Sequence, residues 1–140
     1  MYLYETMNGS RAWAAAQRAW ERGSVYAGCS AGAMILAKRL PNFRRLGAGT
    51  ISGFGAVAAD YVMPHFDHAG PFKFLVNLLR RAMKENEYML GIDEDTALIG
   101  SLGGEWKVMG VGTVHLITRK SEQVFASGEV VPIPGDEERK

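Results

Sequence analysis

The stretch YAGCSAGAMIL, residues 26–36, places a cysteine and a serine side by side among small residues. In a nucleophile elbow, G-x-Nuc-x-G, the central residue occupies a strained strand-to-helix turn, and the flanking glycines keep the packing free of side-chain clashes. Centred on Ser30, the frame has Gly28 and Gly32 in both glycine positions, whereas a frame centred on Cys29 has neither. The spacing favours Ser30 as a nucleophile and predicts that Cys29 is a small buried hydrophobic residue. A tight glycine turn without chemistry is the alternative interpretation.

A serine hydroxyl needs a general base, and the base needs a group that orients it. His65, in MPHFDH, follows a strand-like run, which puts it near a strand end where α/β sheets hold their sites. His68 falls in the following loop and His115 in a late β segment, where packed or surface histidines are ordinary. The segment GIDEDT ends another strand with three candidate carboxylates. They are Asp93, Glu94 and Asp95.

A metal site is the competing interpretation of the same histidines. His65, His68 and either His115 or Asp67 offer metal-ligating side chains. The H-x-x-H spacing next to a proline lacks the i,i+4 geometry of helical zinc motifs, so no metal is expected.

Helices and strands must alternate along the chain to bring these segments together. Residues 10–23 are typical of a short amphipathic helix with Ser10 as its N-cap. SVYAG, residues 24–28, is predicted as a buried strand that runs into the serine turn. AMILAKRL, residues 33–40, has helix-forming composition, and residues 41–55 predict a surface loop.

The second half of the chain continues this pattern and then becomes rich in β segments. A strand is predicted to end near Pro64, and a second amphipathic helix to run from Pro71 to Glu85. YMLGIDE, residues 88–94, is the next strand, and the segments TALIG, EWKVMG, GTVHLITR and QVFASGEVVPI follow it. The sequence therefore predicts an α/β fold with a largely parallel sheet and flanking helices.

Length and composition limit the classes of protein. The 140 residues suit one domain, residues 1–140, and the net charge of +1 gives no electrostatic case for nucleic acid or an anionic membrane. The single cysteine excludes an internal disulfide framework, and the start MYLYETMNGS lacks the pattern of a signal peptide. A cytoplasmic protein is therefore expected.

Three motifs in order resemble a known family. AGCSAGAMIL, then PHFDH and then LGIDEDTAL resemble the serine peptidase family of dipeptidase E and cyanophycinase, whose fold is akin to the class I glutamine amidotransferases. The resemblance implies that Ser30 is the nucleophile, His65 the general base and Glu94 the orienting acid, with Asp93 as the second choice. It further implies that the N–H of Ala31 is an oxyanion donor.

The resemblance also implies a reaction and a substrate class. Family members hydrolyse peptide links next to aspartate through an acyl-enzyme and need no cofactor, which makes a small peptide the expected partner. Substrate carboxylates need cations to bind them, so Arg44, Arg45 and Lys73 are predicted near the substrate. Asp67 is also predicted to lie near the substrate. Relatives that cleave cyanophycin carry closely spaced arginines where this chain has DHAGPFKF, which disfavours that polymer as the substrate.

One departure from the family concerns the N-terminal side. Relatives carry several sheet strands and a second oxyanion donor ahead of the elbow, whereas Ser30 stands early in this chain. Without those strands an exposed sheet edge is expected, and exposed edges pair with other chains, so a homo-oligomer is predicted. The alternative function is a catalytically silent or truncated homologue that serves as a binding or assembly module.

Overall fold

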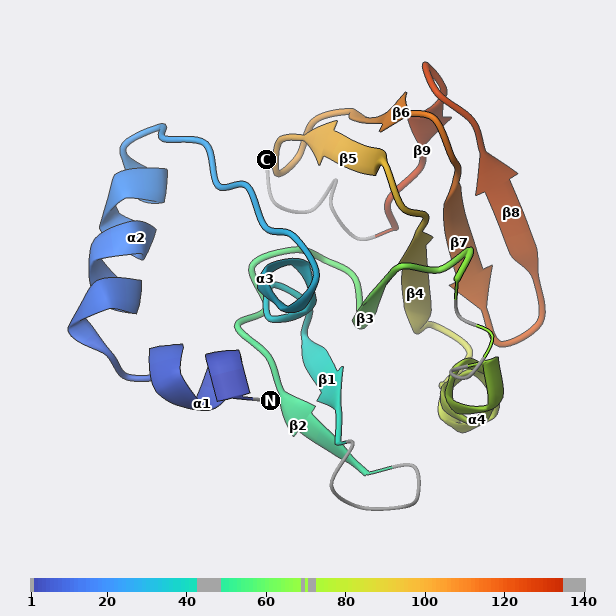
Figure 1. Cartoon of the computed structure of the whole chain (residues 1–140), viewed down its shortest axis with the longest axis horizontal. Helices are drawn as coiled ribbons and strands as arrows, with labels where there is room; N and C mark the ends of the chain where they lie inside the picture. Colours follow the sequence, from blue (N-terminus) through green and yellow to red (C-terminus); the bar gives the residue numbers. More distant parts are fainter. Residues whose placement is uncertain (1, 43–48, 69, 71–72, 135–140) are drawn as a thin grey trace.

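The computed structural model describes residues 2–42, 49–68, 70 and 73–134 (Figure 1). Helices α1 and α2 lie at one side of the molecule, the largest sheet lies at the other, and α3 lies between them (Figure 1). In chain order the elements are α1 (Tyr2–Met7), α2 (Arg11–Glu21), α3 (Ala31–Met34), β1 (Arg39–Pro41), β2 (Thr50–Ser52), β3 (Tyr61–Pro64), α4 (Lys73–Ala82), β4 (Tyr88–Ile92), β5 (Thr96–Gly100), β6 (Trp106–Gly110), β7 (Val114–Thr118), β8 (Glu122–Phe125) and β9 (Val130–Val131).

The largest sheet has four strands in the order β3-β4-β7-β8. β3 and β4 run parallel, because helix α4 carries the chain back between them. The pairs β4–β7 and β7–β8 are antiparallel, as are the pairs of the β5-β6-β9 sheet and the β1–β2 pair. The α/β class is therefore confirmed, but among the described strands the predicted parallel pairing is found only between β3 and β4. Short connections reverse the chain between β5 and β6 and between β7 and β8, whereas β4 reaches its antiparallel neighbour β7 only after the β5–β6 excursion.

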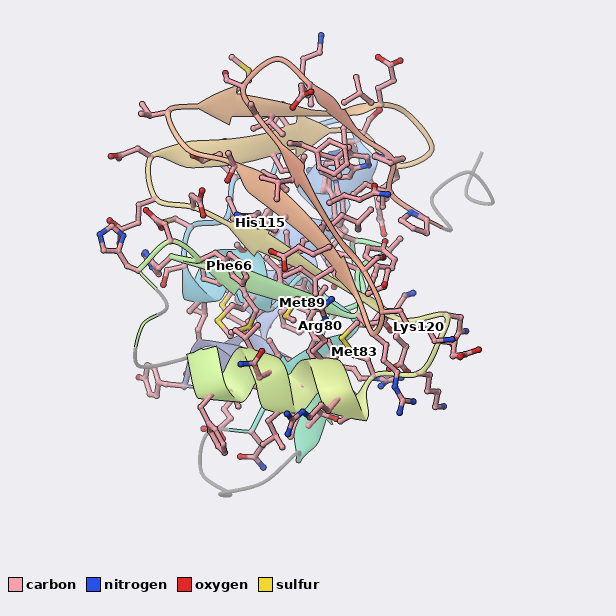
Figure 2. All side chains as sticks on the ribbon, turned by 90° about the vertical axis from the view of Figure 1, so that its right-hand side faces the viewer. Phe66, Arg80, Met83, Met89, His115 and Lys120 are labelled. Carbon is pink, nitrogen blue, oxygen red and sulfur yellow. The ribbon has the colours of Figure 1, made fainter. Side chains whose placement is uncertain are left out.

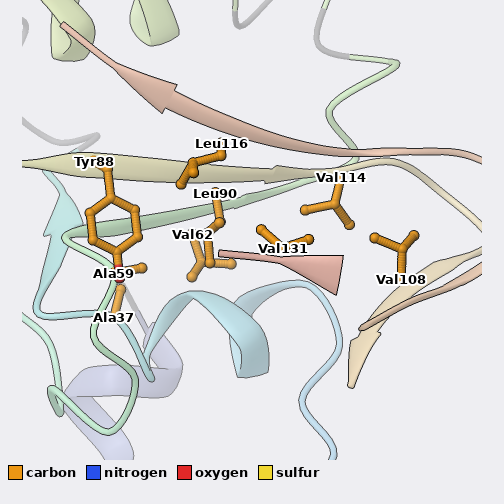
Figure 3. Packing of buried hydrophobic residues seen from close by; sticks show 9 residues of the cluster. All are labelled: Ala37, Ala59, Val62, Tyr88, Leu90, Val108, Val114, Leu116 and Val131. Atoms are coloured by element: carbon orange, nitrogen blue, oxygen red, sulfur yellow. The ribbon is translucent and has the colours of Figure 1, made fainter. Parts of the chain in front are cut away.

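Successive side chains of the central strands point to opposite faces of the sheet, so the core has two layers. On one side of the sheet, Met89 packs with Met83, which directly follows α4 (Figure 2). Met63 belongs to the same cluster. On the other side, Val62 and Leu90 lie in a cluster that also holds Leu116 and Val131 (Figure 3). β3 and β4 are thus buried on both faces, as strands of parallel pairs usually are.

Helix α2 confirms the predicted amphipathic helix and its cap. The Ser10 hydroxyl accepts a hydrogen bond from the N–H of Trp13 at 3.0 Å. The buried Trp13 ring stacks on Phe54, with centroids 3.9 Å apart, and meets Tyr26 edge-on at 6.1 Å. The helix therefore packs against the segment that leads to Ser30.

The strand predicted for residues 24–28 is wrong. These residues form an irregular segment outside every described sheet, and the Val25 side chain is 93% exposed. No described strand pairs with this segment, so the apolar Val25 side chain has no sheet layer to pack into.

The helix and loop predicted for residues 33–55 are only partly correct. Helix α3 ends at Met34, because the chain then leaves the helix to bond elsewhere: the N–H groups of Lys38 and Arg39 donate to the carbonyls of Ala59 and Asp60, both at 3.0 Å. Within the predicted loop, β2 pairs with β1. Residues 43–48 of that loop lie outside the described residues.

Helix α4 confirms the second predicted amphipathic helix. Its inner side buries Val76 and Leu79 against the sheet. Pro71, expected in the first turn, lies outside the described residues. In the part of the chain that the structure describes, no helix has the length and apolar composition needed to cross a membrane.

Candidate active site

Ser30 stands at a sharp turn that leads directly into α3. Its backbone has φ 50° and ψ −118°, a sparsely populated conformation that costs an L-residue about 1–3 kcal/mol. The Tyr26 hydroxyl donates to the Gly32 carbonyl at 3.1 Å, and an added Cβ on Gly28 would lie 2.5 Å from the same oxygen. The turn therefore has the strain and the close packing of an elbow, although an irregular segment leads into it.

The side chain of Cys29 is exposed, so its predicted burial is wrong. Burial was expected because a strand end would hold the thiol against the sheet. Residues 24–28 do not enter a described sheet, and the thiol faces solvent instead.

Three side chains from three separate segments form a line. The Nε2 atom of His65 lies 3.2 Å from the Oγ atom of Ser30. The Nδ1 atom of His65 lies 3.0 Å from the Oε1 atom of Glu94. This is the order of contacts that nucleophile, general base and orienting acid require. The structure thus brings together the three residues that the family resemblance implied as nucleophile, base and acid.

The parallel pairing of β3 with β4 explains why His65 and Glu94 meet. Pro64 lies opposite Ile92, so the segments that follow the two strands leave the sheet at the same edge. The N–H of Phe66 donates to the Ile92 carbonyl at 3.1 Å and keeps the two segments together beyond the strands. Helix α3 packs against β3 and places Ser30 beside them.

Left-handed backbone conformations mark the same region. Among the described residues, the non-glycine residues with positive φ are Ser30 at 50°, His65 at 56° and Asp95 at 52°. Two belong to the line of contacts, and Asp95 directly follows Glu94. Strain of this kind persists where surrounding structure imposes it, and it concentrates at functional sites.

Asp67 contacts the acid of this line. Its Oδ1 atom accepts a hydrogen bond from the N–H of Glu94 at 3.0 Å, and its Oδ2 atom lies 3.0 Å from Nδ1 of His68. The hydrogen bond from the Glu94 N–H holds the pKa of Asp67 below its usual range against the opposing effect of desolvation, and the neighbouring His68 lowers the pKa further. His68 Nδ1 also lies 3.7 Å from Oε2 of Glu94.

The predicted cationic residues are not placed by the structure. Arg44 and Arg45 lie outside the described residues, and only the backbone of Lys73, at the start of α4, is described. Their contact with substrate stays a prediction.

Asp93, the second choice for the acid, points away from the line. Its Oδ2 atom accepts hydrogen bonds from the N–H and hydroxyl of Thr113 at 2.8 and 2.6 Å. Its Oδ1 atom lies 3.7 Å from Nε2 of His115. Asp93 therefore ties the segment after β4 to the neighbouring antiparallel strand, a contact for which the sequence gives no local signal.

Thr96 is a residue beside the site that was not predicted from the sequence. Its hydroxyl donates to the Glu94 carbonyl at 3.0 Å and accepts from the N–H of Gly112 at 2.9 Å. A threonine two residues after the acid is a recognisable turn signal, because short hydroxyl side chains bond to nearby backbone.

The predicted oxyanion donor lies at the start of α3. The N–H groups of Gly32 and Ala33 donate to the carbonyls of Cys29 at 2.8 Å and Ser30 at 3.0 Å. The N–H of Ala31, in the first turn, has no acceptor within the described part of the chain. This N–H can therefore donate a hydrogen bond to a substrate oxygen, which is the predicted role.

The metal interpretation gains no support from the arrangement of side chains. Across residues 2–42, 49–68, 70 and 73–134, no group of three or more His, Cys, Asp or Glu side chains is spaced to hold a metal ion. Both ring nitrogens of His65 face Ser30 and Glu94 instead.

Comparison with known proteins agrees with the three motifs. The model of peptidase family S51 matches residues 1–104. The crystal structure of a peptidase from an acI-B1 Actinobacterium is similar to this chain, with a TM-score of 0.71 and 34% sequence identity. The match covers 85% of this chain and 50% of the other, so this chain spans about half the length of that peptidase. No curated protein matches the sequence. The chain belongs to peptidase family S51, and the family resemblance of its motifs is confirmed.

Proposed function

We propose that the chain is a serine-type peptidase in which Ser30 is the nucleophile, His65 is the general base and Glu94 orients His65. The observation that carries the proposal is the line of contacts from Ser30 through His65 to Glu94, at 3.2 and 3.0 Å. Membership of a peptidase family supports the same reaction class. A core related to the class I glutamine amidotransferases is part of the proposal, supported by the helix-flanked parallel pair β3–β4.

The proposed reaction is acyl transfer through an ester on Ser30. Glu94 accepts a hydrogen bond from the N–H at Nδ1 of His65, which leaves the lone pair of Nε2 facing the serine hydroxyl. As Oγ attacks the peptide carbonyl carbon, the hydroxyl proton moves to Nε2, and the N–H of Ala31 donates to the developing oxyanion. His65 gives the proton to the leaving amine as the C–N bond breaks. Water then gives a proton to His65 as it attacks the ester carbonyl carbon, and His65 passes that proton to Oγ of Ser30 as the ester C–O bond breaks.

The proposed substrates are small peptides with an aspartyl residue at the cleaved link. The side chains of His65 and Glu94 are 50% and 46% exposed, so a short peptide can reach them without passing through a tunnel. The family resemblance supplies the aspartyl preference, which calls for a cation, and Arg44, Arg45 and Lys73 remain the candidates. Rates with Asp-Xaa dipeptides against matched Glu-Xaa and Ala-Xaa dipeptides measure this preference.

We also propose that copies of the chain associate. Hydrogen bonds to reacting groups are worth most where water is excluded, and this site is half exposed. In the described sheet β3 is an edge strand, which can pair with another chain. Sedimentation velocity of the purified chain measures the state of association.

The test of the proposed function is labelling with a fluorophosphonate serine probe, followed by intact mass. Wild-type protein should gain a single adduct, and the adduct should be lost in Ser30→Ala and in His65→Ala. Cys29→Ala is the matched control, because its exposed thiol lies next to Ser30 and should not carry the adduct. A folded wild type that gains no adduct would contradict the proposal and favour a binding or assembly module.

A further inference from the structure

Asp67, which the sequence places near the substrate, has contacts within the protein. One carboxylate oxygen accepts the Glu94 N–H at 3.0 Å, and the other lies 3.0 Å from His68. Both oxygens therefore have a protein partner.

The contact with Glu94 closes a ring between two segments. His65 and Asp67 follow β3 at positions two residues apart, and Glu94 follows β4. His65 binds the carboxylate of Glu94 while Asp67 binds its main-chain N–H. With the His65 contact alone, the backbone of Glu94 could move while its carboxylate stayed bonded to the imidazole. Contacts at both the carboxylate and the main-chain N–H fix the position and the orientation of the residue.

The other side-chain contacts of this segment involve groups other than the N–H of Glu94. Thr96 binds the carbonyl of Glu94 and restrains the following turn. Asp93 binds Thr113 and restrains the preceding residue. In the described part of the chain, the main-chain N–H of Glu94 bonds to Asp67, and this bond links Glu94 to the segment that carries His65.

From this geometry we propose that Asp67 is a positioning residue for the proposed Ser30–His65–Glu94 site: it holds Glu94 against His65 through the main-chain N–H and does not bind substrate. The inference rests on the proposed function. Asp67 acts as a hydrogen-bond acceptor in this role, so an uncharged acceptor of the same shape can replace it. A residue that bound a cationic substrate group would need the negative charge.

The variants Asp67→Ala and Asp67→Asn separate these two roles. Asparagine keeps an acceptor oxygen for the Glu94 N–H without the charge, and alanine removes both. Loss of one such hydrogen bond should lower kcat by roughly tenfold in Asp67→Ala with little change in KM. Asp67→Asn should stay within about threefold of wild type, because the bond is retained. His68→Gln removes the exposed His68 pair and should change kcat by about threefold or less.

Nitrogen NMR of labelled histidine provides a readout that does not depend on turnover. The chain has three histidines, so a His65→Ala spectrum assigns the His65 signals. In wild type and Asp67→Asn, neutral His65 should carry its proton on Nδ1, facing Glu94. In Asp67→Ala the tautomers should become mixed, because Glu94 is less firmly held.

The outcomes distinguish this inference from the proposed function. Equal rates and an unchanged Nδ1–H tautomer in Asp67→Ala would overturn the positioning role. A raised KM with unchanged kcat in both variants would also overturn it and restore a substrate contact. If the wild type neither turns over nor labels, the proposed function fails, and the tautomer of His65 alone decides whether Asp67 positions Glu94.

Discussion

The close approach of Gly28 to Gly32 makes Gly28→Ala a sharp test of the elbow. A Cβ at Gly28 would lie 2.5 Å from the carbonyl oxygen of Gly32 and 2.8 Å from Cε1 of Tyr26. The Tyr26 ring can turn, but the carbonyl belongs to the first turn of α3 and cannot move alone. Relief of the clash therefore displaces the turn that holds Ser30, which lies between the two glycines.

The size of the displacement follows from the contact distance. Ordinary contact begins at 3.4 Å, so the added methyl group is about 0.9 Å too close. A shift of about 1 Å at a reacting group can lower a rate by roughly 10²-fold. Overpacking of this kind also destabilises a fold by about 1–3 kcal/mol. Gly28→Ala should therefore label with the serine probe about 10²-fold more slowly and unfold at lower denaturant.

Gly32→Ala is the matched control within the same motif. The nearest atom to its added Cβ is the Tyr26 hydroxyl at 3.8 Å, which is ordinary contact. Gly32 lies inside α3, where alanine is favoured over glycine by about 0.5–1 kcal/mol. This variant should label within about threefold of wild type and unfold at the same or higher denaturant.

The assay compares labelling rates by intact mass and free energies of unfolding in urea for the three proteins. Wild-type rate and stability in Gly28→Ala would refute the steric argument. Equal damage from Gly28→Ala and Gly32→Ala would show that the glycine pattern matters for another reason than contact distance.

Two further predictions concern the sheet that carries the site. Gly91→Ala should lower the free energy of unfolding by about 1–3 kcal/mol, because its Cβ would lie 2.7 Å from the Phe66 ring; thermal unfolding at wild-type temperature would contradict this. Burial of Glu87 opposes its ionisation, but the Lys84 N–H and the Arg39 guanidinium outweigh burial and hold the pKa of Glu87 below its usual value. Because the folded pKa is lowered, this stabilisation is present above about pH 4.5 and is lost as the pH falls through the folded value. In urea unfolding across that range, the free energy of unfolding of Glu87→Gln should fall less steeply toward low pH than that of the wild type. An equally steep fall in both proteins would exclude the Arg39–Glu87 pair as its cause.

The geometry of the site could be predicted well from local sequence. The glycine frame around Ser30, a histidine just after one strand and an acid just after the next are all local patterns. The parallel pairing of β3 and β4 then brings His65 and Glu94 to one edge. The choice of Glu94 over Asp93 came from the family resemblance, because either acid fits the local pattern.

Features that depend on distant partners were predicted poorly. SVYAG has the composition of a strand, yet Val25 is exposed because no described strand pairs with that segment. The exposure of Cys29 follows from the same missing partner. The contact between Asp67 and the Glu94 N–H depends on how two loops meet, which local composition does not encode.

The left-handed backbone at Ser30, His65 and Asp95 has a consequence for engineering heat resistance. Each such conformation costs about 1–3 kcal/mol, and a domain of this kind has a total stability of about 5–15 kcal/mol. Replacement of these residues by glycine would relieve the strain, but at Ser30 and His65 it would also remove the proposed reacting groups. Thermostability and reactivity therefore compete at the same backbone positions. Stabilising substitutions are better sought in segments whose side chains do not support the site, such as the exposed face of α2.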